Sequence, residues 1–251
     1  MSGHSKWATI KRKKGAADAK RGKLFTKLIR ELATAARMGG GDISANPRLR
    51  LAVEKARGAN MPKDTLSRAI QRGTGGGAES VFEEVVYEGY GPGGTAVLVE
   101  GLTDNRNRTV GEVRHVFTKA GASLGAPGCV AHLFEKKGLI AFDAKGLEGD
   151  ALLEAALEAG ADDVREGGEQ WVVVTAPGAF DAVKAGLDGR GFRAATAEIT
   201  LEPSTTVPLA GAEAEAMLKL AEALEDLDDI QSVYANFDIP DEVMQQLAGG
   251  A

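Results

Sequence analysis

Cysteine, histidine and aromatic residues are scarce in this sequence. Among 251 residues there are 1 cysteine and 3 histidines, and aromatic side chains make up 5% of the chain. The single thiol, Cys129, excludes an internal disulfide and a cysteine-rich zinc module, and it fits a reducing compartment. Few nucleophile and base pairs are available for covalent catalysis.

Long apolar runs are missing as well. No stretch approaches the roughly 20 apolar residues of a membrane span, and charged residues stand where a signal peptide needs an apolar core. With 43% hydrophobic and 26% charged residues, the composition is that of an ordinary globular protein with room for two or three small domains. We therefore expect a folded, cytoplasmic protein without a membrane partner.

What the chain does have is a strong separation of charge. Residues 1–77 contain 18 lysines and arginines against 5 acidic residues, whereas residues 78–251 contain 12 against 31, which gives net charges of +13 and −19. A segment this basic attracts polyanions such as nucleic acids, and the acidic remainder repels them. A nucleic acid is therefore expected to approach the N-terminal third. Solvated helix faces are the alternative explanation. The size of the imbalance favours nucleic-acid contact by the N-terminal third.

The basic third begins with a segment that has no apolar periodicity. Residues 1–22 include a run of four cations at 11–14, which is typical of a mobile arm that orders on a partner. From Lys23 on, apolar residues recur at helical spacing, and the glycines at 39–41 end the pattern. The sequence therefore predicts a first helix from Lys23.

Two further helices are predicted before the charge changes sign. Asn46 can cap a helix whose first residue is Pro47, where the missing N–H costs nothing. Pro62 begins a third, short helix, and the glycines at 73–77 break the chain. Residues 23–77 are thus expected to form a three-helix basic domain followed by a glycine-rich linker.

Beyond residue 78 the apolar period changes from helical to strand-like. Segments 81–89 and 95–103 flank a Gly-Pro-Gly-Gly turn and predict a hairpin, followed by a helix over 106–119 and a strand over 130–134. The next segments predict strand, helix, strand, strand, helix and strand, which is the order of a ferredoxin-like unit. They span 138–142, 150–158, 163–166, 170–175, 179–187 and 195–202.

The last elements predict how the domains are connected. A strand at 206–209, an acidic helix at 212–227 and a strand at 233–237 are expected to complete the sheet that begins at Val81. The predicted fold is therefore multi-domain α+β, with a three-helix N-terminal domain and two α+β domains, one of them ferredoxin-like (βαββαβ) and inserted in the other. The predicted boundaries are 1–22 for the arm, 23–77 for the helical domain with its linker, 78–136 plus 204–240 for the discontinuous domain, 137–203 for the inserted domain, and 241–251 for a C-terminal tail.

Several patterns resemble catalytic or cofactor motifs. The G-x-G-x-x-G match at 89–94 lies between two predicted strands, so a hairpin turn is favoured over a dinucleotide site. Cys129 and His132 are spaced like zinc ligands, but a buried thiol beside an ordinary histidine is favoured. Acidic pairs such as Asp228-Asp229 are expected to be caps and solvated charge. We predict no catalytic residue, cofactor, metal or small-molecule substrate.

Three other segments bear on nucleic-acid binding. Residues 104–109 join a strand to a helix and offer Arg106 and Arg108 to RNA, unless the segment only caps the helix. Trp7 can stack on an unpaired base or pack on the helices, with stacking favoured. The second and third helices, with the short turn 59–62, also fit a helix-turn-helix.

The predicted nucleic-acid-binding residues come from the arm, the three helices and the 104–109 segment. They are His4, Lys6, Trp7, Lys11, Arg12, Lys13, Lys14, Lys20, Arg21, Lys23, Lys27, Arg30, Arg48, Arg50, Lys55, Arg57, Lys63, Arg68, Arg72, Arg106 and Arg108.

A set of short motifs is distributed over most of the chain. They are Gly3-His4-Ser5-Lys6-Trp7, Lys20-Arg21-Gly22-Lys23, Phe25-Thr26-Lys27-Leu28-Ile29-Arg30-Glu31, Gly39-Gly40-Gly41-Asp42, Asn46-Pro47-Arg48-Leu49-Arg50, Ala59-Asn60-Met61-Pro62-Lys63-Asp64, Tyr87-Glu88-Gly89-Tyr90-Gly91-Pro92-Gly93-Gly94 and Leu102-Thr103-Asp104-Asn105-Arg106-Asn107-Arg108-Thr109. Together they resemble the YebC/PmpR family. Cys129 and Ala122 depart from the usual Ser and Gly of that family, and no family function is attached to these two positions.

The resemblance implies three domains, one inserted in another, without catalysis or a cofactor. The family is described as cytoplasmic transcriptional regulators that bind DNA, while some members, including mitochondrial relatives, resemble translation factors. We therefore expect a non-enzymatic, DNA-binding transcriptional regulator. The alternative is a ribosome-associated, RNA-binding translation factor that assists peptide-bond formation on difficult, for example proline-rich, sequences. An enzyme with its site between the two α+β domains is a third possibility, but no convergent set of titrating residues supports it.

Overall fold

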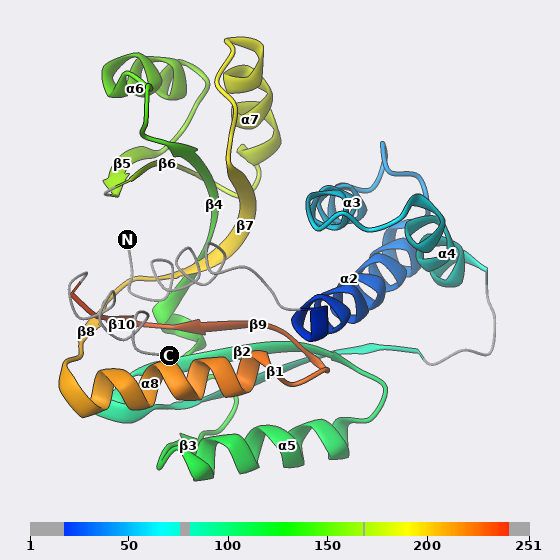
Figure 1. Ribbon diagram of the computed structural model, residues 1–251, viewed down its shortest axis with the longest axis vertical. Helices are drawn as coiled ribbons and strands as arrows, with labels where there is room; N and C mark the ends of the chain where they lie inside the picture. Colours follow the sequence, from blue (N-terminus) through cyan, green and yellow to red (C-terminus); the bar gives the residue numbers. More distant parts are fainter. Residues whose placement is uncertain (1–17, 76–80, 168, 241–251) are drawn as a thin grey trace.

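The computed structural model describes residues 18–75, 81–167 and 169–240 (Figure 1). Over these ranges a helical unit lies beside a central α+β unit, from which a second α+β unit projects. The predicted multi-domain α+β fold is confirmed. None of the helices in these ranges has the length and apolar character that a bilayer span requires.

The helical unit consists of three helices around one core. They are α2 (Asp18–Gly39), α3 (Pro47–Gly58) and α4 (Lys63–Thr74). The predicted start of the first helix at Lys23 was wrong, because its first turn is polar and carries no apolar periodicity to reveal it. Gly73 does not break the chain but lies within α4. A Cβ at this position would lie 2.2 Å from the carbonyl oxygen of Ala33, so glycine permits the close packing of α4 on α2.

Asn46 ties the start of α3 to the end of α2. As predicted, it is the N-cap: its Oδ1 accepts a hydrogen bond from the main-chain N–H of Leu49 at 3.0 Å. Its Nδ2 donates to the carbonyl oxygens of Ala35, at 2.8 Å, and Gly40, at 2.9 Å. Asn46 is buried, so one side chain provides hydrogen-bond partners for three main-chain groups at the ends of two helices, and the bonds to Ala35 and Leu49 are themselves buried.

We expect Asn46→Ala to lower the free energy of unfolding by about 2 kcal/mol, since it removes a cap and leaves buried main-chain groups without partners. Urea denaturation followed by circular dichroism measures the change. Ser44→Ala is the matched control, because Ser44 is exposed and its hydroxyl donates to the carboxylate of the neighbouring Asp42. A loss for Asn46→Ala as small as that of the control would contradict this role.

The central unit is built on a four-stranded antiparallel sheet in the order β3-β1-β2-β9. Helices α5 and α8 cover one face of it (Figure 1), where Val99, Phe117 and Met217 are fully buried. The predicted hairpin is confirmed, with the 3-10 turn η1 (Pro92–Gly94) between its strands. The elements are β1 (Glu83–Tyr90), β2 (Ala96–Thr103), α5 (Arg106–Lys119), β3 (Ser123–Leu124), α8 (Gly211–Glu225) and β9 (Ile230–Ala235).

Strand β8 (Val207–Pro208) does not join this sheet, contrary to the prediction. It pairs in parallel with β10 (Phe237–Asp238) as a separate two-stranded sheet. The strand is short, and Pro208 has no N–H to donate to a longer ladder.

The inserted unit is ferredoxin-like, as predicted. Its antiparallel sheet has the order β5-β6-β4-β7, and α6 and α7 pack on it through a core that includes Ile140, Leu152 and Phe180. Its elements are β4 (Phe134–Asp143), α6 (Gly149–Glu158), β5 (Asp163–Gly167), β6 (Gln170–Thr175), α7 (Phe180–Gly189) and β7 (Thr196–Pro203).

The separate strand predicted over 130–134 was wrong. This segment forms the 3-10 turn η2 (Ala131–Leu133), and β4 begins directly after it. The carboxylate of Glu88 accepts hydrogen bonds from the main-chain N–H groups of Gly128, Val130 and Ala131 at 2.6, 2.8 and 2.7 Å. These N–H groups therefore donate to a side chain from β1 and not to a neighbouring strand. The local sequence pattern does not indicate this contact.

Candidate nucleic-acid interface

The predicted binding residues fall into three groups in the structure. Residues of the arm lie outside the described ranges: His4, Lys6, Trp7, Lys11, Arg12, Lys13 and Lys14. Only the backbone of Lys20 and Arg21 is described, in α2. The other cations contact a second unit of the chain, form ion pairs within the central unit, as Arg106 and Arg108 do, or lie on the outer face of α3 and α4.

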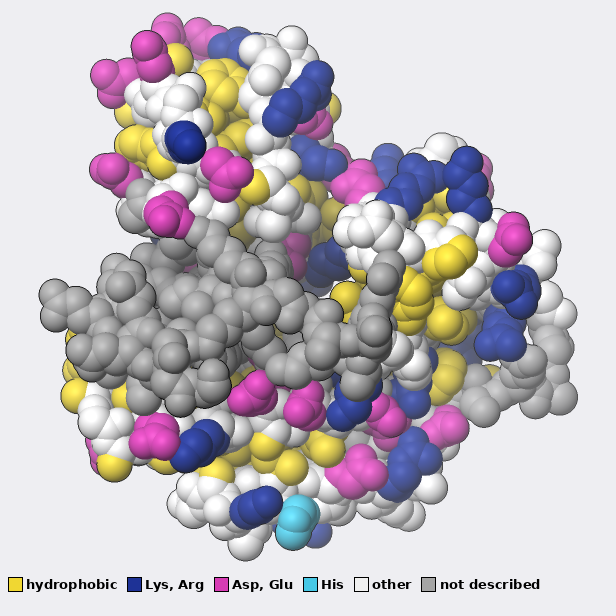
Figure 2. Space-filling model, in the orientation of Figure 1, with side chains coloured by type: hydrophobic (Ala, Val, Ile, Leu, Met, Phe, Trp, Pro, Cys, Tyr) yellow, Lys and Arg dark blue, Asp and Glu magenta, His cyan; other side chains and the backbone are white. Residues whose placement is uncertain are grey.

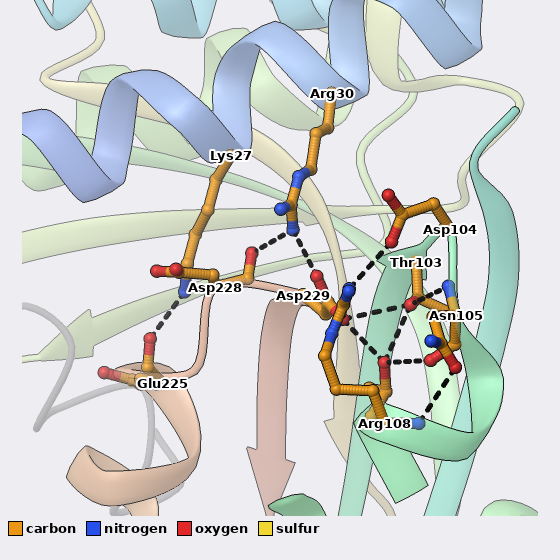
Figure 3. A network of polar contacts seen from close by, with 10 residues as sticks. Lys27, Arg30, Thr103, Asp104, Asn105, Arg108, Glu225, Asp228 and Asp229 are labelled. Atoms are coloured by element: carbon orange, nitrogen blue, oxygen red, sulfur yellow. Dashed lines mark hydrogen bonds and ion pairs between the residues drawn. The ribbon is translucent and has the colours of Figure 1, made fainter. Parts of the chain in front are cut away.

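Three cations of α2 lie at the acidic turn that follows α8, residues 225–229. Lys23 Nζ donates to the main-chain carbonyl oxygen of Asp226 at 3.1 Å. Lys27 Nζ and Arg30 Nη1 donate to those of Glu225 and Asp228, each at 2.5 Å (Figure 3). The last carbonyls of a helix lack partners within the helix, and its C-terminus carries partial negative charge. Cations of the helical unit thus provide hydrogen-bond donors and positive charge at the C-terminus of α8.

Asp229 is the centre of this contact. Its side chain is 3% exposed, and Oδ1 accepts from Arg30 Nη1 at 2.7 Å. Oδ2 accepts from Arg108 Nη2, Thr109 Oγ1 and Thr103 Oγ1 at 2.6, 2.6 and 3.0 Å (Figure 3). Burial opposes ionisation, but the donors outweigh it and lower the pKa of Asp229. The prediction that this residue is solvated charge was wrong, because its partners are distant in sequence.

The arginines of the 104–109 segment are also engaged within the chain. Asn105 caps α5, as its Oδ1 accepts from the N–H of Arg108 at 3.1 Å, so the capping interpretation is confirmed for this residue. Arg108 also pairs with Asp104 at 2.7 Å. Arg106 pairs with Glu83 at 2.6 Å, and both side chains are exposed. The ion pairs of this segment therefore connect the start of α5 to β1, through Arg106, and to the residue before β9, through Arg108.

Cations of α3 connect the helical unit to the other two units. Arg48, Arg50 and Lys55 each reach a carboxylate outside the helical unit. The partners are Glu84 at 2.5 Å, Asp181 at 3.4 Å and Glu198 at 3.3 Å. These pairs are partly exposed, so each contributes about 1 kcal/mol or less, but together they orient the units.

The remaining predicted cations share one outward surface. We call it the α3–α4 surface: Arg57, Lys63, Arg68 and Arg72, with the exposed polar residues Asn60, Ser67 and Gln71 between them. Leu66 and Ala69 on the opposite side of α4 are buried in the helical core. Figure 2 shows Lys and Arg side chains over this part of the molecule.

The cations of the α3–α4 surface differ in their contacts from those of α2. In the part of the chain that the structure describes, neither Arg57 nor Lys63 has an ion-pair partner. Arg68 Nε donates to the main-chain carbonyl oxygen of Asp64 at 3.2 Å. Within the described ranges the guanidinium of Arg68 therefore contacts a carbonyl group and not a carboxylate. This surface therefore offers positive charge to an external anion.

Cys129 and His132 are not part of a metal-binding group as far as the structure describes the chain. Within the described ranges no three His, Cys, Asp or Glu side chains gather in a way that fits a metal ion. Cys129 is partly buried, and its carbonyl oxygen accepts a hydrogen bond from Tyr90 at 3.1 Å.

Comparison with known proteins agrees with this architecture. The model of the TACO1/YebC protein N-terminal domain matches residues 5–76, and that of the TACO1/YebC second and third domain matches residues 82–237. The chain belongs to the TACO1/YebC family. In this TACO1/YebC chain the first match includes the helical unit, and the second includes both α+β units. The resemblance inferred from the motifs is confirmed.

Two relatives match this chain over their whole length. A protein of Trichlorobacter lovleyi is 60% identical over 247 residues, which is 98% of this chain and 100% of the relative. One of Syntrophus aciditrophicus is 59% identical over 250 residues, 99% of this chain and 100% of the relative. Both are named "probable transcriptional regulatory protein". The crystal structure of a conserved hypothetical protein from Aquifex aeolicus has 52% identity and a TM-score of 0.81, and the match covers 89% of this chain and 92% of that one.

Proposed function

We propose that this protein is a non-enzymatic regulator of gene expression that binds nucleic acid through the α3–α4 surface and acts in the cytoplasm. The observation that carries the proposal is the division of the cations. The cations of α2 whose side chains are described and three cations of α3 contact other units, whereas Arg57, Lys63 and Arg68 lie outward without a carboxylate partner within the described ranges.

Duplex DNA in transcription is the first candidate ligand. The names of the relatives support a role in transcription. The geometry supports a helix-turn-helix mode, because α4 follows α3 after a four-residue turn and has a continuous exposed polar side. A helix presented in this way fits the major groove, with cations near its ends on phosphates.

The acidic remainder of the molecule supports the same orientation. Residues 78–251 carry a net charge of −19, and the excess of acidic residues in α8 and in the inserted unit repels a polyanion. Encounter is therefore directed to the helical unit, and binding weakens as salt screens the attraction.

RNA on the ribosome is the second candidate, and one observation favours it. An open groove with an apolar floor lies next to Arg57 and Lys63. Apolar surface beside cations suits unpaired bases, which RNA loops offer and regular duplexes do not. A regulator of translation would use the same surface.

The test is a fluorescence anisotropy titration with duplex DNA and with a structured RNA, over roughly 50 to 200 mM salt. We expect the double variant Lys63→Ala/Arg68→Ala to bind both more weakly. The slope of log affinity against log salt should fall in magnitude by about 2 for duplex DNA, because two phosphate contacts are lost.

Arg190→Ala/Arg193→Ala is the matched control, since it removes the same charge from exposed positions in the inserted unit. Its slope should stay at the wild-type value. Equal slopes for wild type and Lys63→Ala/Arg68→Ala would refute the proposed surface. Absence of salt-sensitive binding to either polymer would refute nucleic-acid binding itself.

A further inference from the structure

A groove lies along one edge of the α3–α4 surface, with Arg57, Asn60, Lys63 and Ser67 of that surface in its lining. Its cavity is about 660 Å³, which lies within the range of roughly 300–1,000 Å³ that small-ligand sites occupy. The floor is apolar and is made by Ile43, Met61, Leu66 and Ile70. Arg57 and Lys63 stand at its rim.

The turn between α3 and α4 holds the groove in a fixed shape. Asn60 has φ +58°, and its N–H donates to the carbonyl of Arg57 at 2.9 Å. The N–H of Met61 donates to the carbonyl of Ala56 at 2.9 Å, which completes a Schellman ending of α3. Met61 is thereby anchored in the helical core, with 6% of its surface exposed. The groove does not depend on a mobile segment for its floor.

The polar groups at the groove complement a nucleotide rather than a purely apolar ligand. Asn60 offers an amide and Ser67 a hydroxyl, and both are exposed and line the groove. These groups can donate to and accept from a base edge. The planar guanidinium of Arg57 can stack on a base, while Lys63 supplies a point charge for a phosphate.

We infer that this groove binds one unpaired nucleobase of a single-stranded nucleic acid, with the base between the apolar floor and the guanidinium of Arg57 and a flanking phosphate at Lys63. The inference rests on the proposed nucleic-acid binding and specifies the ligand of that surface. Unpaired bases occur in RNA loops and in locally opened DNA, and the same chemistry recognises both. A duplex with every base stacked would contact only the rim.

The first experiment separates the contribution of the base to the binding affinity from that of the phosphates. Binding of the full chain is measured for a single strand of about ten nucleotides and for the same strand with abasic sites, which keeps the backbone charge. We expect wild type to bind the base-bearing strand about tenfold more tightly, in line with the contribution of one base. RNA and DNA versions of the strand distinguish the two sources of the base.

Ser67→Phe fills the groove, and Gln71→Phe adds the same ring to the exposed side of α4 outside the groove. The tenfold preference should disappear in Ser67→Phe and persist in Gln71→Phe, with affinity for the abasic strand unchanged in both. Arg57→Lys keeps the charge but removes the stacking plane, so it should reduce the preference without altering the salt slope.

Two results would overturn the inference. If wild type binds both strands equally and with the same salt dependence, the groove holds no base, yet the proposed nucleic-acid binding stands. If wild type binds neither strand nor duplex, both proposals fall. Folding of each variant is checked by circular dichroism, and Ser67 is exposed, so its replacement leaves the helical core intact.

Discussion

Asp229→Asn will lower the local stability of the central unit by about 3 kcal/mol and loosen the helical unit from it. A buried carboxylate that accepts from two arginines and two threonines is replaced by an amide, whose NH2 group must face one set of these donors. Breaking a buried ion pair leaves uncompensated charge, which is among the costliest single changes in a folded protein.

Hydrogen exchange measured by mass spectrometry tests this prediction unit by unit, because a protein with several units need not unfold in one step. Peptides from β2, α5 and β9 should exchange about a hundredfold faster, and α2 should also lose protection. Asp228→Asn is the matched control, since Asp228 is the exposed neighbour. Equal exchange in the two variants would show that Asp229 does not hold the units together.

Glu88→Gln will destabilise the turn before β4 by about 2 to 3 kcal/mol at neutral pH. Glu88 is 7% exposed, and its carboxylate accepts from three main-chain N–H groups. Hydrogen bonds to a charged acceptor are stronger than those between neutral groups. Burial alone would raise the pKa of Glu88, but these three N–H groups outweigh it and lower the pKa. The folded state therefore favours the charged form.

The sign of the pH dependence follows from the lowered pKa. The contribution of Glu88 is complete above the ordinary glutamate pKa of about 4.3 and is lost as the pH falls from there through the folded-state value. The difference in unfolding free energy between wild type and Glu88→Gln should thus shrink on acidification. Urea denaturation at a series of pH values measures it. Glu84→Gln, on the same strand but exposed, should show almost no difference, and a pH-independent gap for Glu88→Gln would contradict this account.

The sequence predicted those parts of the fold that depend on local pattern. The switch from helical to strand-like spacing located the helical unit, the hairpin and the ferredoxin-like order of the inserted unit. The cap at Asn46 and the start of α5 at Arg106 were predicted because capping residues act on the first turn of their own helix.

Long-range polar contacts could not be predicted in this way. Asp229 directly precedes β9 and Glu88 lies within β1, and no pattern nearby in the sequence indicates their partners, which are 40 to 199 residues away. The same holds for the cations. Composition marks the N-terminal third as basic, but only the fold shows that Arg30 pairs with the central unit while Lys63 lies outward. The proposed binding surface is thus smaller than the basic segment.

Crosslinking in living cells tests the central claim most directly. Ultraviolet crosslinking of the full chain, followed by sequencing of the attached nucleic acid and mapping of the linked peptides, identifies polymer and surface together. We predict links within residues 57–72. Promoter DNA would assign the regulation to transcription, and ribosomal RNA would assign it to translation. Absence of crosslinked nucleic acid, or links confined to α6, α7 and α8, would contradict the claim that the α3–α4 surface binds nucleic acid.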